Sequence, residues 1–203
     1  MKLYYMPGAC PLADHIVLEW VGAKYEMVEV ERDKLKSPEY LKINPRGAVP
    51  ALADGEFVLT ENVAILNYIA DLYPDKKLHG DGTPRGRAEV NRWLGFINSD
   101  IHQSFKPIFG PGSYVADKSQ HAELIANASQ RLSNLFKIVN TPLTEHDWLT
   151  GASRSIADPY LFVMLLWAKG KSIDLSGLDG LERFFQRMQA DVGVKAAMHA
   201  EGL

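Results

Sequence analysis

The stretch MKLYYMPGACPLADHIVLEWVGAKYEMVEV, residues 1–30, places one helical pattern between two short β-rich runs. Residues 2–6 form the first run and residues 25–30 the second. Between the two runs, apolar side chains recur at helical spacing, at Ala13, Ile16, Val17, Trp20 and Val21. Two strands on either side of a helical crossover lie parallel in one sheet, so the stretch predicts a β-α-β unit.

The chain then continues with a hairpin and a second helix. Two short apolar runs flank Asp54-Gly55, which is a strong signal for a β-hairpin. Apolar residues return to helical spacing over residues 63–72, and Thr60 or Asn62 is the natural N-cap of that helix. The predicted order to this point is β-α-β-(α)-β-β-α.

Beyond residue 72 the amino-acid composition changes. Proline, glycine and charged residues are concentrated before residue 87, as is typical of a linker. We therefore divide the chain into an α/β domain over residues 1–78, a linker over residues 79–86 and an all-helical domain over residues 87–203. Helical patterns cover residues 87–105, 120–139, 156–168, 181–189 and 194–199. The third of these is almost entirely apolar, so it should run through the centre of a helix bundle.

The charge, the apolar segments and the cysteine count limit which partners, which cellular location and which kinds of site we expect. The 203 residues carry a formal net charge of −3 and no basic cluster, which gives no reason to expect nucleic acid or an anionic membrane as a partner. With no signal-peptide pattern and no long apolar span, we expect a cytoplasmic protein. The single cysteine, Cys10, cannot form an internal disulfide or a multi-thiolate metal site, and we expect no metal. Cys10 is either a small buried residue or a working thiol.

Four local sequences carry a resemblance to a known family. They are MKLYYMPGAC at residues 1–10, NPRGAVPAL at 44–52, LTENVAILNYIADLYP at 59–74 and GASRSIADPYLF at 151–162. In this order and spacing they resemble the soluble glutathione transferases, and the opening and the final AEGL resemble the bacterial beta class. The resemblance covers essentially the whole chain. It implies a thioredoxin-like glutathione-binding domain followed by a helical bundle domain.

The resemblance also implies where glutathione binds. Cys10 would lie at the active site, and Val49 before a cis Pro50 would pair its backbone with the cysteinyl part of glutathione. Asn62, with the amides of its helix, would bind the γ-glutamyl carboxylate, and Glu61 would pair with the ammonium group. Without the resemblance, the last two read equally well as ordinary helix-start residues.

For Cys10 we predict a lowered pKa. Pro11 suits the first position of a helix, which places Cys10 at the N-cap, where the helix dipole favours thiolate. Asp14 opposes this effect with a negative charge in the same turn.

The resemblance implies a second group of site residues in the helical domain. His102 is either an interdomain histidine or a catalytic residue that contacts the sulfur of glutathione or its bound water. Gln103 stands where the beta class has a lysine and would border the ligand. The family forms homodimers, so residues of the stretch 98–102, with Ser99 among the predicted site residues, would reach glutathione in the partner subunit.

Three residues of the first domain have weaker assignments. Tyr5 is the better candidate of two adjacent strand tyrosines for the site. Lys34 and Lys36 are solvated charges, unless one reaches the glycine carboxylate of glutathione as a lysine in this region does in relatives.

In the helical domain, Ser155 and Asp158 form a capping box, whose function is folding.

The function predicted from these residues is conjugation of the glutathione thiol to a small hydrophobic electrophile by a homodimeric transferase. Two alternatives remain. One is a glutathione-dependent thiol-disulfide reductase in which Cys10 forms the mixed disulfide. The other is a non-catalytic glutathione-binding stress protein of the same fold.

Overall fold

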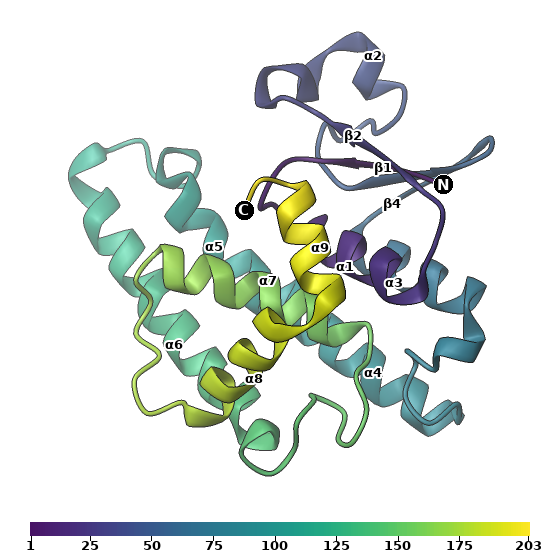
Figure 1. The fold of residues 1–203 in the computed structure, drawn as a ribbon. Helices are drawn as coiled ribbons and strands as arrows, with labels where there is room; N and C mark the ends of the chain where they lie inside the picture. The colour runs from purple at the N-terminus through teal and green to yellow at the C-terminus, as the bar shows by residue number, and fades with distance from the viewer.

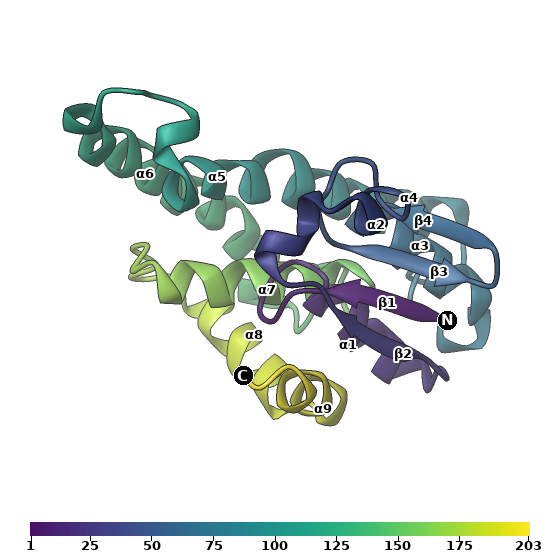
Figure 2. The same ribbon diagram turned by 90° about the horizontal axis from the view of Figure 1, so that it is seen from above.

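The computed structural model describes all 203 residues. Its sheet has four strands in the order β2-β1-β3-β4 (Figure 2). They are β1 (Lys2–Tyr5), β2 (Glu26–Glu29), β3 (Ala51–Asp54) and β4 (Phe57–Thr60). The first two strands are parallel, with Leu3 opposite Met27, and β3 runs antiparallel to both β1 and β4. The predicted β-α-β unit and hairpin are therefore confirmed.

Helices lie on both faces of the sheet. α1 (Leu12–Val21) and α3 (Asn62–Leu72) cover the face that is turned toward the rest of the molecule, and the short α2 (Pro38–Leu41) lies on the other side (Figure 1). A 3₁₀ turn at Arg32–Lys36 precedes α2, and another at Pro74–Lys76 follows α3. Period-2 alternation directs Leu3 and Tyr5 of β1 inward, and both side chains are buried.

The second half of the chain is entirely helical. It consists of α4 (Pro84–Phe96), α5 (Gln103–Phe109), α6 (His121–Glu145), α7 (Ala157–Gly170), α8 (Asp179–Ala190) and α9 (Val192–Ala200), with 3₁₀ turns at Pro111–Ser113 and Lys118–Gln120. As predicted, α7 is buried along most of its length and runs through the bundle. None of these helices is both long and apolar enough to cross a membrane.

Two helix boundaries differ from the sequence prediction. α4 begins at Pro84, inside the predicted linker, because the Thr83 hydroxyl accepts a hydrogen bond from the backbone N–H of Gly86 and caps the helix there. The single helix predicted over residues 87–105 is instead α4 and α5 joined by a π-helical turn at Ile97–His102. Such turns often occur at functional sites, and this one ends at His102.

One hydrophobic core extends through both halves of the chain. Helix α1 packs against α7 and α9, which brings the C-terminal residues beside the loop that follows β1 (Figure 1). The buried carboxylate of Glu201 accepts a hydrogen bond from the Gly8 backbone N–H at 3.0 Å and lies 3.0 Å from His15 Nδ1. The two halves are therefore held together by packing and by buried polar contacts.

Ser155 and Asp158 are hydrogen-bonded at the start of α7 as the capping box predicts, although the residue that directly precedes the helix is Ile156. The Asp158 carboxylate accepts hydrogen bonds from the Ser155 backbone N–H at 2.6 Å and from its hydroxyl at 3.0 Å. Its second oxygen accepts one from the backbone N–H of Leu149 at 3.0 Å. Both capping residues are completely buried, which fits a role in folding.

Candidate active site

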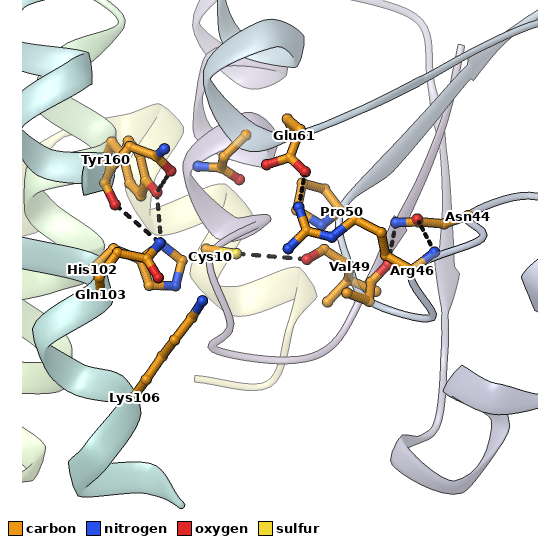
Figure 3. Close-up of a pocket in the computed structure, with 13 residues that line it drawn as sticks. Cys10, Asn44, Arg46, Val49, Pro50, Glu61, His102, Gln103, Lys106 and Tyr160 are labelled. Carbon is orange, nitrogen blue, oxygen red and sulfur yellow. Dashed lines mark hydrogen bonds and ion pairs between the residues drawn. The ribbon is translucent and has the colours of Figure 1, made fainter. Parts of the chain in front are cut away.

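A cavity of ≈ 170 Å³ opens between the sheet half and the helical half of the molecule (Figure 3). On the sheet side it is bordered by Cys10, by the turn that leads into β3 and by the start of α3. On the helical side it is bordered by Asn98, His102, Gln103, Lys106 and Tyr160. Figure 3 shows His102 and Tyr160 facing Val49 and Pro50 across the cavity, with Cys10 between them.

The turn before β3 is built by its own side chains. Asn44 donates from Nδ2 to the Ala48 carbonyl at 2.6 Å, and its Oδ1 accepts from the Arg46 backbone N–H at 3.0 Å. Gly47 has a φ of 58°, and a Cβ there would lie 2.5 Å from a backbone oxygen, so only glycine fits. This turn leads into the Val49–Pro50 peptide bond, which is cis as predicted.

The structure corrects the position of Cys10. Pro11 has helical φ and ψ angles and precedes α1 as its N-cap, so Cys10 lies one residue before the cap. The physical reason is that the first i to i+4 hydrogen bond starts at the Pro11 carbonyl, whereas the Cys10 carbonyl accepts only the i+3 bond from Ala13. The thiol is therefore displaced from the position at which a helix N-terminus binds an anion.

The predicted lowering of the Cys10 pKa is wrong for the free protein. Cys10 is 8% exposed, and its thiol donates a hydrogen bond to the Val49 carbonyl oxygen at 3.8 Å, which requires the protonated form. Burial first and the carboxyl group of Asp14 second raise the pKa of the Cys10 thiol. Desolvation outweighs the helix dipole here.

Asn62 borders the cavity as predicted, but it is not the N-cap of its helix, and its role toward the γ-glutamyl carboxylate stays a prediction. α3 starts at Asn62 itself, and Glu61 precedes it with a φ of 72° and no side-chain capping bond. Asn62 is buried, and with its amide nitrogen facing α1 it donates to the Cys10 carbonyl at 3.2 Å and to Asp14 Oδ2 at 3.0 Å. Its side chain therefore supports the start of α1, because a buried amide must find partners inside the protein.

Glu61 borders the cavity and forms an ion pair with Arg46 at its rim (Figure 3). Sequence reasoning missed Arg46, because within NPRG it reads as an ordinary turn residue. The pair is more than half exposed, so it is free to exchange partners with a charged ligand.

His102 and Tyr160 form the helical wall of the cavity. His102 Nδ1 lies 2.7 Å from the Tyr160 hydroxyl oxygen, and the His102 ring packs edge-on against Trp167 with centroids 5.0 Å apart. Burial, and then the positive charge of Lys106, lower the pKa of His102 to about 4. His102 is therefore neutral at physiological pH.

Two residues of the helical wall, Lys106 and Tyr160, were not predicted from the sequence, whereas Asn98 belongs to the stretch that was expected near glutathione. Lys106 lies four residues after His102, so helical spacing alone could have placed it on the same face. Tyr160 gave no such signal, since it reads as a core residue of α7. Gln103 borders the cavity as predicted, and its Nε2 donates to the Asn98 backbone carbonyl at 3.2 Å.

Three predicted site residues do not border this cavity. Tyr5 points into the core because it shares the inward face of β1. Lys34 lies in the 3₁₀ turn before α2, where it pairs with Asp33 at 3.7 Å and is largely exposed. Ser99 Oγ lies 2.8 Å from the Gly95 carbonyl oxygen and 2.7 Å from Asp100 Oδ2, and its role toward a partner's ligand stays a prediction.

The charges around the cavity favour an anionic ligand. Arg46 and Lys106 are positive and Glu61 is negative, and Lys106 has no ion-pair partner in the chain. His102 is neutral, so the rim carries one surplus positive charge. No group of three His, Cys, Asp or Glu side chains is arranged to bind a metal ion.

Comparison with known proteins decides the family. Residues 1–71 match the family model of the glutathione S-transferase N-terminal domain, and residues 101–191 match that of the C-terminal domain. Glutathione S-transferase GST-4.5 of Xanthomonas campestris is 50% identical over 203 residues, which cover 100% of both chains. The chain belongs to the glutathione S-transferase family.

Solved structures of transferases agree with this result. A sphingomonad glutathione S-transferase complexed with glutathione matches with a TM-score of 0.88 and 36% identity, covering 100% of both chains. A bacterial beta class transferase from Sphingomonas chungbukensis matches with a TM-score of 0.88 and 38% identity, again over 100% of both chains. The predicted resemblance and the predicted fold class, a thioredoxin-like domain followed by a helical domain, are confirmed.

Proposed function

We propose that this transferase conjugates the thiol of glutathione to small hydrophobic electrophiles. The observation that carries the proposal is the cavity between the two halves, where the Val49–Pro50 backbone and Glu61 face His102 and Lys106. Its surplus positive charge complements glutathione, whose two carboxylates and one ammonium group sum to −1. The sphingomonad relative was solved with glutathione bound, which supports the same ligand here.

Each rim residue then has a role in holding glutathione. Glu61 exchanges Arg46 for the γ-glutamyl ammonium group, and the freed Arg46 faces the adjacent carboxylate. The Val49 backbone pairs with the cysteinyl part. Lys106 takes the glycine carboxylate in place of Lys34, because Lys106 borders the cavity and Lys34 does not.

The chemical step uses the sulfur of glutathione as the nucleophile. Neutral His102 accepts the thiol proton, and the resulting thiolate attacks the electrophilic carbon held beside it. Trp167 lies against His102, and Phe105 and Phe109 pack against Trp167, so this aromatic cluster offers an apolar surface for the electrophile. Phe109 is half exposed, so part of this surface is open to a ligand.

Two assays on the wild type and Cys10→Ala test the proposal against the reductase alternative. Conjugation of dinitrochlorobenzene should survive in Cys10→Ala, because the buried Cys10 thiol is not the nucleophile. Reduction of hydroxyethyl disulfide should be weak in the wild type, since a protonated thiol attacks disulfides poorly. Strong disulfide reduction that Cys10→Ala abolishes would favour the reductase. Retained glutathione binding without either activity would favour the non-catalytic protein.

We also propose a homodimer with two-fold symmetry. Large apolar side chains are exposed on β4 and α3, namely Phe57 at 51%, Val58 at 42% and Leu72 at 44%. Burial of such side chains against a second copy would stabilise the pair. Light scattering should give about twice the 22.6 kDa of one chain. A monomer that still binds glutathione would contradict this proposal.

A further inference from the structure

Tyr160 stands between two hydrogen-bonding partners. Its hydroxyl group donates to Asn98 Oδ1 at 2.9 Å, and its oxygen lies 2.7 Å from His102 Nδ1. The Tyr160 ring is completely buried in α7, so its position is set by the packing of the bundle. Asn98 lies in the π-helical turn that ends at His102. All three residues border the cavity.

The position of one hydrogen follows from this arrangement. A tyrosine hydroxyl has a single hydrogen, and here it is directed to Asn98. The short contact between the Tyr160 oxygen and His102 Nδ1 therefore requires a hydrogen on Nδ1. A neutral imidazole carries only one N–H, so Nε2 of His102 has a free lone pair.

The remaining nitrogen is available for chemistry. His102 Nε2 makes no hydrogen bond within the chain, and His102 borders the cavity opposite Val49 and Pro50 (Figure 3). Trp167 packs against the His102 ring and donates from Nε1 to the Gly8 carbonyl at 2.8 Å. The His102 ring therefore lies between Tyr160 and Trp167, and Trp167 is hydrogen-bonded to the loop before Cys10.

We propose that Tyr160 and Asn98 are positioning residues that hold His102 with its hydrogen on Nδ1, so that Nε2 accepts the proton of the glutathione thiol. The inference rests on the proposed function, because that function places glutathione in this cavity. Without Asn98 as acceptor, the Tyr160 hydroxyl could turn its hydrogen toward Nδ1. The hydrogen of His102 would then move to Nε2, which could no longer accept a proton.

The proton and electron changes balance. The thiol proton moves to His102 Nε2, leaving a thiolate and an imidazolium whose Nδ1–H stays on the Tyr160 oxygen. The thiolate electron pair forms the new carbon–sulfur bond. In a substitution the leaving group departs with its bonding pair, and the imidazolium releases the thiol proton to solvent, which restores neutral His102. In an addition the proton on Nε2 is returned to the product carbanion, which restores neutral His102.

The hydrogen position can be measured in the free protein. Selective ¹⁵N labelling of histidine, with the His102 signals assigned by their loss in His102→Gln, reports which ring nitrogen is protonated. We expect a protonated Nδ1 and an unprotonated Nε2 at neutral pH. A protonated Nε2 would overturn the inference. No turnover is needed, so a protein with the expected tautomer that conjugates no electrophile contradicts only the proposed function.

Two substitutions at Asn98 separate its acceptor role from its packing. Asn98→Ala removes the acceptor, and we expect the His102 hydrogen to move to Nε2. Asn98→Asp keeps an acceptor oxygen at nearly the same volume, so the hydrogen should stay on Nδ1. The same tautomer in both variants would contradict the role of Asn98.

Tyr160→Phe keeps the buried ring and removes the oxygen that receives Nδ1–H. We expect kcat for conjugation to fall by roughly 10- to 100-fold, part of the contribution of a general base, with little change in KM for glutathione. Tyr68→Phe is the matched control, because it also loses one hydroxyl hydrogen bond, to Asp54 at 2.8 Å, outside the cavity. A Tyr160→Phe protein with wild-type kcat and wild-type tautomer would refute the inference.

Discussion

Helices α1 and α7 both carry a completely buried aspartate in their first turn. The two carboxyl groups differ in the number of hydrogen bonds that they accept. Asp158 of α7 accepts three hydrogen bonds, from Leu149 and from the backbone and hydroxyl of Ser155. Asp14 of α1 has one oxygen, Oδ1, without any partner. Its other oxygen contacts only the amide of Asn62.

The difference separates a residue that serves folding from one beside the functional site. Burial raises the pKa of both carboxyl groups, to about 6 for Asp158, where three hydrogen bonds limit the rise. The pKa of Asp14 is raised well above its ordinary value, by burial and then by the charge of Glu201. Buried polar groups without hydrogen-bond partners are rare in proteins. Because the Asp14 carboxyl group lacks one such partner and lies near Cys10, we infer that the start of α1 serves the functional site as well as the fold.

Removing the Asp158 carboxylate, which accepts three hydrogen bonds, should lower the stability of the protein more than the other substitutions do. Asp158→Ala leaves the buried N–H groups of Leu149 and Ser155 without acceptors, so we expect the free energy of unfolding to fall by about 2–4 kcal/mol. Denaturant titration measures this loss. Glutathione affinity of the folded fraction should stay at the wild-type level, and an affinity loss without a stability loss would place Asp158 in the site instead.

The start of α3, beside Asp14, should show the opposite pattern. Glu61→Ala removes the proposed partner of the glutathione ammonium group, and we expect glutathione binding to weaken by about 1.5–3 kcal/mol, with little change in stability because Glu61 is exposed. Calorimetry measures the affinity. Glu56→Ala, which removes an exposed carboxylate outside the cavity, is the control. Equal affinities of the two variants for glutathione would show that Glu61 does not bind the ligand.

Alkylation of Cys10 tests the electrostatics of the α1 start directly. Because burial and Asp14 raise the pKa of its thiol, iodoacetamide should modify native Cys10 at least about tenfold more slowly than it modifies free glutathione at pH 7. Mass spectrometry follows the reaction. The rate should increase on unfolding. Rapid alkylation of the folded protein would show that the helix dipole dominates after all.

Ser155→Ala should have a smaller effect than Asp158→Ala, since it removes the hydroxyl group of the cap but leaves the carboxylate. We expect stability to fall by about 0.5–2 kcal/mol, the usual range for a lost cap. Thermal and denaturant unfolding measure the change. A loss as large as that of Asp158→Ala would mean that the hydroxyl and the carboxylate act as one unit.

Asp14→Asn should have the smallest effect at acidic pH, near the pKa of an unfolded aspartate, and the dependence of its effect on pH is the informative measurement. A carboxyl group with a raised pKa binds its proton more tightly in the folded state, so wild-type stability falls as pH rises above the unfolded value near 4. Asparagine does not titrate. At pH 4.5 the two proteins should differ by about 1 kcal/mol or less. At higher pH the variant should become progressively the more stable one, and a constant difference across pH would show that Asp14 is already ionised in the fold.

Local sequence was sufficient for the elements that depend on neighbours in the chain. The Asp54-Gly55 hairpin, the crossover helix α1 and the Ser155–Asp158 capping box all follow from residues within a few positions of one another. The site was predicted only in part. Lys106 had a helical-spacing signal that could have been used, whereas Tyr160 reaches Asn98 across 62 positions and no local pattern connects them.

What the sequence by itself determined is the family, the order of strands and helices, and the segments that border the cavity. Only the tertiary structure decided the surroundings of the groups there: the burial of the Cys10 thiol against the Val49 carbonyl, the inward-facing Asn62 amide and the short contact between His102 Nδ1 and the Tyr160 hydroxyl. The physical reason is that ionisation and hydrogen-bond direction depend on which distant side chains exclude water and supply partners. Glu201, 186 positions from His15, acts on Asp14 only because α9 folds back onto α1.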